Sequence, residues 1–340
     1  KRQRGQFFTQ RRVVELLVKL VSPQDGDRVL DPAAGSGGFL SGALRQIRAE
    51  GGEPELHMVE ASPRLVKVAR ASMILHGAVD RGMVTGDGLA PWSEMVSTCG
   101  PGSVQRVLSN PPFAGTSDGR ITEASILTRF RTGHRWNQGP TGPAVTDALL
   151  SEGAPPELLF LERCLDWLEP GGWLGIVLPK AVLDTKTYLG GRAVLFEQAD
   201  LKGVITLHRN AFQPHTGVQT CLILAQKRAR GEPESAEPVF MALSRRAGQD
   251  SEGRPVYRRD STGGQTGELD EDLSEILEAW QAHQRGELQP AEYRFSVPRN
   301  SIGSELQINP QAFRPSLNAT LAQVEAIEQR EGWSTLRLGE

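Results

Sequence analysis

Asn110, Pro111, Pro112 and Phe113 form the stretch best suited to chemistry, because they combine a carboxamide, two rigid residues and an aromatic ring. The Asn110 side-chain oxygen and the Pro111 backbone carbonyl can each accept a hydrogen bond. Proline fixes φ and so holds these acceptors in place, while an aromatic face can stack on a planar ring. The tetrapeptide therefore fits the binding of a planar amine. It also fits a plain turn at the end of a strand, so the surrounding elements must decide.

The segments around this tetrapeptide alternate between apolar runs and helically spaced apolar residues. The runs predict strands over residues 28–31, 56–60, 83–85, 104–109, 173–178, 203–207 and 218–225. The helical spacing predicts helices over residues 13–20, 39–47, 63–76, 157–168 and 192–198. This alternation indicates a parallel sheet with right-handed crossovers. The last two strands are joined by a short loop without a helix, so we expect them to pair antiparallel at the sheet edge.

Glycines and carboxylates follow the first three predicted strands, at the edge where such sheets bind ligands. Asp31 is followed by Gly35 and Gly37, whose lack of a side chain would let a nucleotide-like ligand approach the backbone. Glu60 could accept hydrogen bonds from ribose hydroxyls. Asp87 could accept from an adenine amino group, with Leu89 against the ring. Tight turns, helix caps and solvated strand ends are the alternatives. The glycines do not form GxGxxG, which disfavours a dinucleotide site.

These motifs, in this order, resemble S-adenosylmethionine-dependent N6-adenine DNA methyltransferases, most closely the modification subunits of type I restriction-modification systems. The resemblance is carried by GQFFTQRRVVELLVKLV, DPAAGSGGFL, EASP, ARASMILHG, GDGL, NPPF, EPGGWLGIVLP and FQPHTGVQTCLILAQK, over roughly residues 5–228. It implies a seven-stranded Rossmann-like α/β methyltransferase fold, mostly parallel with an antiparallel edge strand, plus a smaller C-terminal helical and extended extension.

The resemblance also assigns roles to single residues. Phe8 and Thr9 match the segment beside the methionine part of S-adenosylmethionine. Asp31, Ala33, Gly35 and Gly37 match the loop around it, Glu60 the ribose ligand, and Asp87 with Leu89 the adenine site. Asn110, Pro111, Pro112 and Phe113 match the catalytic tetrapeptide. No metal is implied.

A DNA substrate would have to reach this site as a flipped-out base, since an adenine inside a duplex is inaccessible. Arginines near the tetrapeptide and near the start of the chain are then candidates for phosphate contacts. They are Arg4, Arg11, Arg12, Arg120, Arg129, Arg131 and Arg135. Solvated surface positions are the alternative for each of them.

Composition divides the chain into three parts. Residues 1–228 are expected to form the catalytic domain, within which 114–156 reads as a long loop that could contact DNA. Residues 229–267 read as a polar linker, and residues 268–340 as a helical and extended extension. The extension contains a helix around Leu269, Leu273, Ile276, Leu277 and Trp280 and a final helix over 317–330. Its end, EGWSTLRLGE, resembles the start of a target-recognition domain.

The 340 residues carry a net charge of −3 and three widely spaced cysteines, Cys99, Cys164 and Cys221. With no long apolar stretch and no signal-peptide core, we expect a cytoplasmic protein without a membrane segment. The chain starts without a methionine, and we expect a fragment of a longer polypeptide.

The expected function is site-specific methylation of adenine N6 in double-stranded DNA, within a restriction-modification or phage-defence system. The expected partners are a specificity subunit or a fused recognition domain, as in type IIG enzymes, and a restriction subunit. Two alternatives stay open. One is methylation of a ribosomal RNA guanine or a protein glutamine, and the other is a non-catalytic DNA-binding subunit that keeps the fold.

Overall fold

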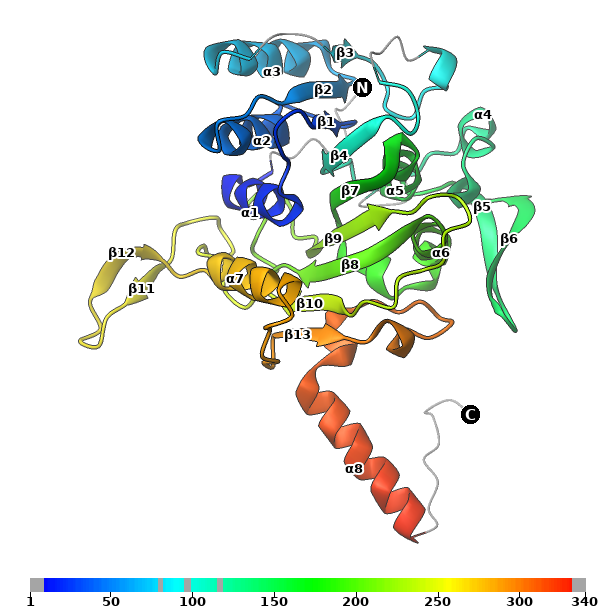
Figure 1. Ribbon diagram of the computed structural model, residues 1–340, viewed down its shortest axis with the longest axis vertical. Coiled ribbons are helices and arrows are strands. Elements are labelled where there is room, and N and C mark those ends of the chain that lie inside the picture. The colour runs from blue at the N-terminus through cyan, green and yellow to red at the C-terminus, as the bar shows by residue number, and fades with distance from the viewer. Residues whose placement is uncertain (1–8, 79–81, 95–98, 115–118, 332–340) are drawn as a thin grey trace.

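A nine-stranded sheet forms the centre of the computed structural model, which describes residues 9–78, 82–94, 99–114 and 119–331. The strands lie in the order β13-β10-β8-β9-β7-β4-β1-β2-β3 (Figure 1). The first part of the chain supplies β1 (Arg28–Asp31), β2 (Glu55–Glu60), β3 (Met83–Thr85) and β4 (Val104–Ser109), which pair in parallel. Its helices are α1 (Arg11–Val21), α2 (Gly38–Ala49) and α3 (Pro63–Leu75). All seven elements were predicted from the sequence.

The second part of the chain supplies the other strands of the sheet, five helices and two hairpins. Its helices are α4 (Ala124–Leu127), α5 (Pro156–Trp167), α6 (Leu189–Gln198), α7 (Leu273–Gln284) and α8 (Pro315–Glu331). Its sheet strands are β7 (Leu168–Pro179), β8 (Ala199–Thr206), β9 (Thr220–Lys227), β10 (Val239–Leu243) and β13 (Arg294–Val297). Two hairpins stand apart from the sheet: β5 (His134–Gly139) with β6 (Gly142–Leu149), and β11 (Tyr257–Arg259) with β12 (Gln265–Leu269).

The predicted seven-stranded, mostly parallel Rossmann-like sheet is confirmed, and two strands extend it. β9 runs antiparallel to both β7 and β8, as predicted for the last pair. It lies inside the sheet, however, so this pair does not form the edge where it was expected; the antiparallel edge strand is β13. The sheet continues beyond β8, because β10 pairs in parallel with β8 and β13 pairs antiparallel with β10.

Three segments carry more structure than the sequence indicated. The predicted loop 114–156 contains α4, the 3-10 turn η3 (Arg131–Gly133) and the hairpin β5–β6. The predicted polar linker 229–267 contains β10, which is buried along its whole length. Leu269 ends β12 and does not belong to α7. The division into domains stays a prediction.

Two layers of helices bury apolar side chains on the two faces of the sheet. One core joins α1, α2, α3 and α7 to one face, and the other joins α5 and α6 to the opposite face. Along β7 the side chains alternate between them, since Leu174, Ile176 and Leu178 belong to the second core and Val177 to the first. This period of two is what a strand covered on both faces requires.

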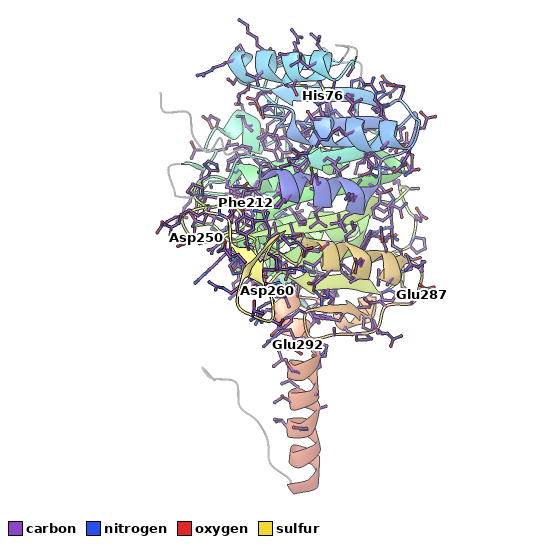
Figure 2. The ribbon with its side chains drawn as sticks, turned by 90° about the vertical axis from the view of Figure 1, so that its left-hand side faces the viewer. His76, Phe212, Asp250, Asp260, Glu287 and Glu292 are labelled. Carbon is purple, nitrogen blue, oxygen red and sulfur yellow. The ribbon has the colours of Figure 1, made fainter. Side chains whose placement is uncertain are left out.

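The edge formed by the carboxyl ends of the parallel strands faces one side of the molecule. Figure 2 shows Phe212 and Asp250 on that side and His76 and Glu287 on the other. α8 projects away from the body of the protein below the sheet (Figure 1). Among the described residues, no helix is long and apolar enough to cross a membrane.

Candidate active site

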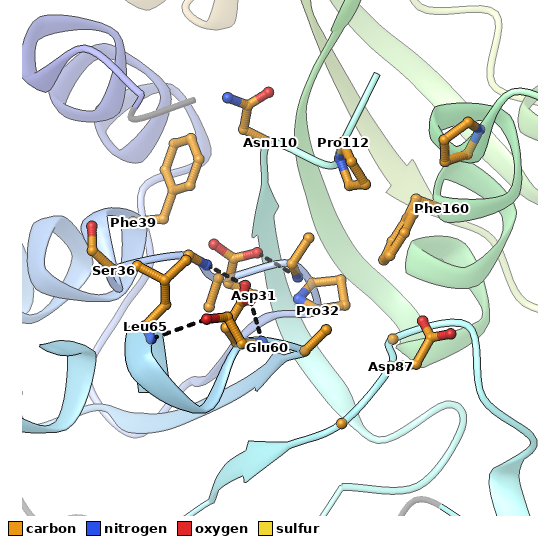
Figure 3. A pocket seen from close by; sticks show the side chains of 18 of the residues that line it. Asp31, Pro32, Ser36, Phe39, Glu60, Leu65, Asp87, Asn110, Pro112 and Phe160 are labelled. Atoms are coloured by element: carbon orange, nitrogen blue, oxygen red, sulfur yellow. Dashed lines mark hydrogen bonds between the residues drawn. The ribbon is translucent and has the colours of Figure 1, made fainter. Parts of the chain in front are cut away.

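A cavity of about 690 Å³ lies at the carboxyl edge of β1, β2 and β4 (Figure 3). We call it the edge cavity. The predicted site residues that line it are Thr9, Asp31, Ala33, Gly35, Glu60, Asp87, Leu89, Asn110 and Pro112. Side chains from five separate segments meet here because β1, β2 and β4 are parallel and therefore end at the same edge.

Asp31 ends β1 and is only 1 % exposed. Its Oδ1 accepts hydrogen bonds from the Ser109 hydroxyl at 2.8 Å and from the Ala33 backbone N–H at 3.1 Å. Burial, which disfavours the charged form, raises the pKa of Asp31 to about 7, although these two hydrogen bonds lower it. The nearby Glu60 raises the pKa slightly further. Asp31 is therefore a buried carboxyl group poised to ionise near neutral pH.

Glu60 ends β2 and holds the turn that follows β1. Its Oε2 accepts from the Gly35 N–H at 2.9 Å, and its Oε1 accepts from the Ser62 N–H at 2.7 Å. Gly35 has a left-handed backbone with φ of 56°, which favours glycine. A carboxylate has about four lone-pair sites, so each Glu60 oxygen keeps capacity for one more donor.

Asp87 and Leu89 form the cavity wall after β3. Asp87 Oδ1 accepts from the Leu89 N–H at 2.9 Å, and Arg129 donates from Nη2 to the Leu89 carbonyl at 2.9 Å. Gly88 allows a close approach, because a Cβ there would lie 2.4 Å from the Pro32 carbonyl oxygen. These two hydrogen bonds fix the turn at residues 87–89. Asp87 Oδ2 is left as an acceptor for a ligand.

Asn110 follows β4 and lines the edge cavity (Figure 3). Its Nδ2 donates to Thr9 Oγ1 at 2.9 Å, which fixes the plane of the carboxamide. Its Oδ1 is buried and has no hydrogen-bond partner within the described part of the chain. A buried acceptor left unpaired costs about 1–3 kcal/mol, so this oxygen is prepared for a donor that a ligand would bring.

Some predicted site residues lie elsewhere. Gly37 does not line the cavity; it has φ of 82°, and a Cβ there would lie 3.1 Å from Ala69 Cβ on α3. Pro111 is buried behind the cavity. Phe113 is partly exposed and packs against the core under α1 and α2. Phe8 and Arg4 fall outside the described residues.

Two aromatic side chains of the cavity were not predicted. Phe39 on α2 and Phe160 on α5 line it on either side (Figure 3). Both lie on helices at positions that read as ordinary core, and both are more than nine-tenths buried. No sequence pattern separates such residues from the rest of a helix's apolar face.

Glu157 connects the end of the turn at residues 110–113, which we call the catalytic turn after its predicted role, to α5 and α6. Its Oε2 accepts from the Ala114 N–H, directly after the tetrapeptide, at 3.0 Å, and its Oε1 accepts from the Tyr188 hydroxyl at 2.6 Å. The side chain is buried, and this burial raises the pKa of Glu157. The Glu157 carboxyl group therefore fixes the backbone directly after the tetrapeptide.

The predicted DNA-contacting arginines have different surroundings. Arg12 donates to Gln249 at 3.2 Å and Arg129 to Leu89, so both bind the protein itself. Arg131 pairs with Glu197, and the exposed Arg11 pairs with Glu15 at 2.8 Å. Arg120 and Arg135 line a second cavity beside the hairpin β5–β6, where Arg120 also donates from Nη1 to the Gly153 carbonyl at 3.0 Å.

Known proteins resemble this chain in sequence. The methylase subunit of the type I restriction enzyme EcoEI from Escherichia coli is 25% identical over 246 residues, covering 67% of this chain and 43% of that protein. The type II restriction enzyme and methyltransferase RM.BcgI from Heyndrickxia coagulans is 22% identical over 248 residues, covering 70% of this chain and 33% of that protein. The chain thus spans less than half the length of these relatives.

Solved structures share the fold. The type I restriction-modification methyltransferase subunit from Streptococcus thermophilus superposes with a TM-score of 0.65 at 20% identity, covering 91% of this chain and 60% of that one. The family model described as N-6 DNA Methylase matches residues 1–262, which include every strand and helix that lines the edge cavity. On this match, the chain belongs to the N-6 DNA methylase family.

Proposed function

We propose that this chain is the catalytic part of a DNA methyltransferase that transfers a methyl group from S-adenosylmethionine to the N6 amino group of a flipped-out adenine. The observation that carries the proposal is the buried Asn110 Oδ1, which has no hydrogen-bond partner among the described residues and belongs to a residue that lines the same cavity as Asp31 and Glu60. The family membership favours DNA adenine over a ribosomal RNA guanine or a protein glutamine.

The residues of the edge cavity fit S-adenosylmethionine. Glu60 retains acceptor sites for the two ribose hydroxyls, and Asp87 Oδ2 can accept from the adenine amino group. The side chain of Asp31 would lie near the positive sulfonium, a charge that favours the carboxylate form. Gly35 leaves open space, since a Cβ there would meet no atom within 4 Å. When bound, this cofactor supplies an electrophilic methyl group.

Asn110 and Pro111 would prepare the amine for attack. An exocyclic adenine nitrogen is a poor nucleophile because its lone pair is delocalised into the ring. Asn110 Oδ1 and the Pro111 carbonyl can each accept one N–H, which helps the nitrogen to become tetrahedral. Thr9 and the two prolines hold these acceptors in place, so little reorganisation is needed in the transition state. The bound cofactor would supply the methyl group to this nitrogen, and the nitrogen would lose a proton afterwards.

The partly exposed Phe113 is proposed to stack on the flipped base. Base–aromatic stacking contributes about 1–3 kcal/mol. The flanking DNA would then lie over Arg120, Arg135 and the hairpin β5–β6. Arg4, Arg11, Arg12, Arg129 and Arg131 stay predictions as phosphate contacts, although four of them, Arg11, Arg12, Arg129 and Arg131, already bind groups of the protein.

Sequence recognition is proposed to come from a specificity subunit or from a fused recognition domain reached through α8. The helix extends away from the body, and Leu321 on it is 50% exposed. We further propose a restriction subunit or fused nuclease as a partner and a cytoplasmic location, where the DNA is. Replacing Leu321 with Glu in the full-length protein should abolish site-specific methylation and leave cofactor binding unchanged.

The decisive experiment is methylation-sensitive sequencing of DNA from a host that expresses the full-length gene. N6-methyladenine at one defined sequence is expected, and its absence in a host that expresses Asn110→Ala is the control. A labelled-methyl assay on unmethylated genomic DNA, ribosomes and release factors separates the alternatives. Label found in RNA or protein alone would overturn the proposal, and cofactor binding without methyl transfer would indicate a non-catalytic subunit.

A further inference from the structure

The second cavity, of about 270 Å³, lies at the base of the hairpin β5–β6; we call it the hairpin cavity. Its walls come from the hairpin, the turn at 150–153, the 3-10 turn η5 (Lys186–Tyr188) and the first turn of α6. Trp136 anchors the hairpin, because its indole packs on Gly190 so closely that a Cβ there would lie 2.4 Å from the ring. Segments 50 residues apart in sequence thus form one walled site.

Positive charge is concentrated in this cavity. Arg120, Arg135 and Lys186 line it, against one carboxylate, Glu152. Within the described residues, no carboxylate lies within ion-pair distance of any of these three cations, whereas the neighbouring Arg131 is paired with Glu197. α6 also begins beside the cavity without a side-chain cap, so its positive end is available to an anion.

The hairpin cavity and the edge cavity share a wall. Arg120 lines the former and the adjacent Ile121 lines the latter, while Ile121 pairs with Ala154 through two backbone hydrogen bonds of 2.8 and 2.9 Å. On α5, Leu158 faces the hairpin cavity and Phe160 the edge cavity. A ligand in the hairpin cavity is therefore separated from the edge cavity by a single wall of chain.

We propose that the hairpin cavity binds a backbone phosphate of the DNA strand that carries the flipped adenine. This inference depends on the proposed function and adds to it a subsite outside the cofactor and base sites. A flipped nucleotide stays joined to its strand, so its flanking phosphates must pass close to the catalytic turn. Arg135 and Lys186 are exposed and accessible to a polymer, and phosphate contacts of this kind fix the register of a protein on DNA.

The test compares Lys186→Ala with Lys19→Ala in the full-length protein. Lys19 is an exposed lysine at the far end of α1, so both variants lose the same charge. The dissociation constant for a duplex that carries the methylated sequence is measured against salt concentration. Loss of one phosphate contact should reduce the log–log slope by about 0.9 for Lys186→Ala, with no change for Lys19→Ala and unchanged cofactor affinity in both.

A second measurement locates the phosphate. Duplexes with a single neutral methylphosphonate linkage are scanned around the target adenine. At one position, the neutral linkage should weaken DNA binding by the wild-type protein. The same linkage should not weaken DNA binding by Lys186→Ala or Arg135→Ala any further, because these variants have already lost the contact. Equal salt slopes for the two lysine variants would overturn the proposal. So would a scan in which, at every linkage, the effects of the neutral linkage and of the protein variant on binding simply add. A third contradicting outcome is that Lys186→Ala loses a site for inorganic phosphate without any change in DNA binding. If wild-type protein methylates no DNA, the proposed function itself fails.

Discussion

The edge cavity and the hairpin cavity differ in what their charged groups already bind. Asp31, Glu60 and Asp87 in the edge cavity each accept hydrogen bonds from neighbouring backbone amides. Arg135 and Lys186 in the hairpin cavity have no ion-pair partner among the described residues. The first cavity is therefore preorganised for one small ligand of fixed shape. The second offers charge on long side chains, which suits a polyanion whose position is fixed elsewhere.

Asn110→Ala should produce the largest change. Removing a preorganised hydrogen-bonding group from a catalytic site lowers kcat by about 10²–10³-fold, and we expect a loss of that size in single-turnover methylation. Cofactor affinity, measured by calorimetry, should be nearly unchanged because Asn110 binds Thr9 and not the turn after β1. Loss of cofactor binding as severe as in Glu60→Ala would break the assignment of Asn110 to the base.

Glu60→Ala should act first on the cofactor. The change removes two acceptors that hold Gly35 and Ser62 as well as those for the ribose. Hydrogen bonds to charged groups contribute about 1.5–3 kcal/mol, so the cofactor dissociation constant should rise by about 10- to 100-fold. Glu60→Gln, which keeps the shape and one acceptor, is the matched control and should lie in between. An unchanged dissociation constant would remove Glu60 from the cofactor site.

The affinity for S-adenosylmethionine should depend on pH through Asp31. Burial raises the pKa of Asp31 to about 7, so below that pH the free protein holds a neutral acid. A positive sulfonium favours the carboxylate, and binding should therefore tighten as pH rises to about 7 and then level off. The change should be up to about tenfold per pH unit. S-adenosylhomocysteine, which has no positive sulfur, and Asp31→Asn should both show a flat profile.

Glu157→Gln should have the smallest effect. The amide keeps one acceptor but turns an N–H₂ toward either Ala114 N–H or the Tyr188 hydroxyl. A net hydrogen bond contributes about 0.5–1.5 kcal/mol, so kcat should fall by about two- to tenfold. Cofactor affinity should stay constant, and Tyr188→Phe should lose less than Glu157→Gln. A drop in cofactor affinity would contradict this prediction, because it would mean that the contacts of Glu157 also support the cofactor site in the edge cavity.

The strands and helices of the first part of the chain could be predicted because their apolar periodicity is strong. β10 was missed because Val239–Leu243 is a short apolar run between polar segments. The hairpin β5–β6 was missed because none of its residues is buried and its sequence does not alternate between apolar and polar residues.

The candidate site was predictable mainly where residues lie at or just after strand ends. Asp31, Glu60, Asp87 and Asn110 all do, and all line the edge cavity. Phe160 and Lys186 reach the cavities, and Glu157 reaches Ala114, from elements distant in sequence, which local patterns do not reveal. The pairing of Arg131 with Glu197, 66 residues away, is equally hidden from sequence.

The two outermost strands of the sheet limit how this protein can join other chains. β3 has three residues and β13 has four, and Arg294 of β13 is tied to Glu275 on α7 at 2.7 Å. Edges this short offer few free backbone groups for strand addition, which is the usual route to unwanted aggregation. The sheet itself is therefore poorly suited to joining another chain edge to edge.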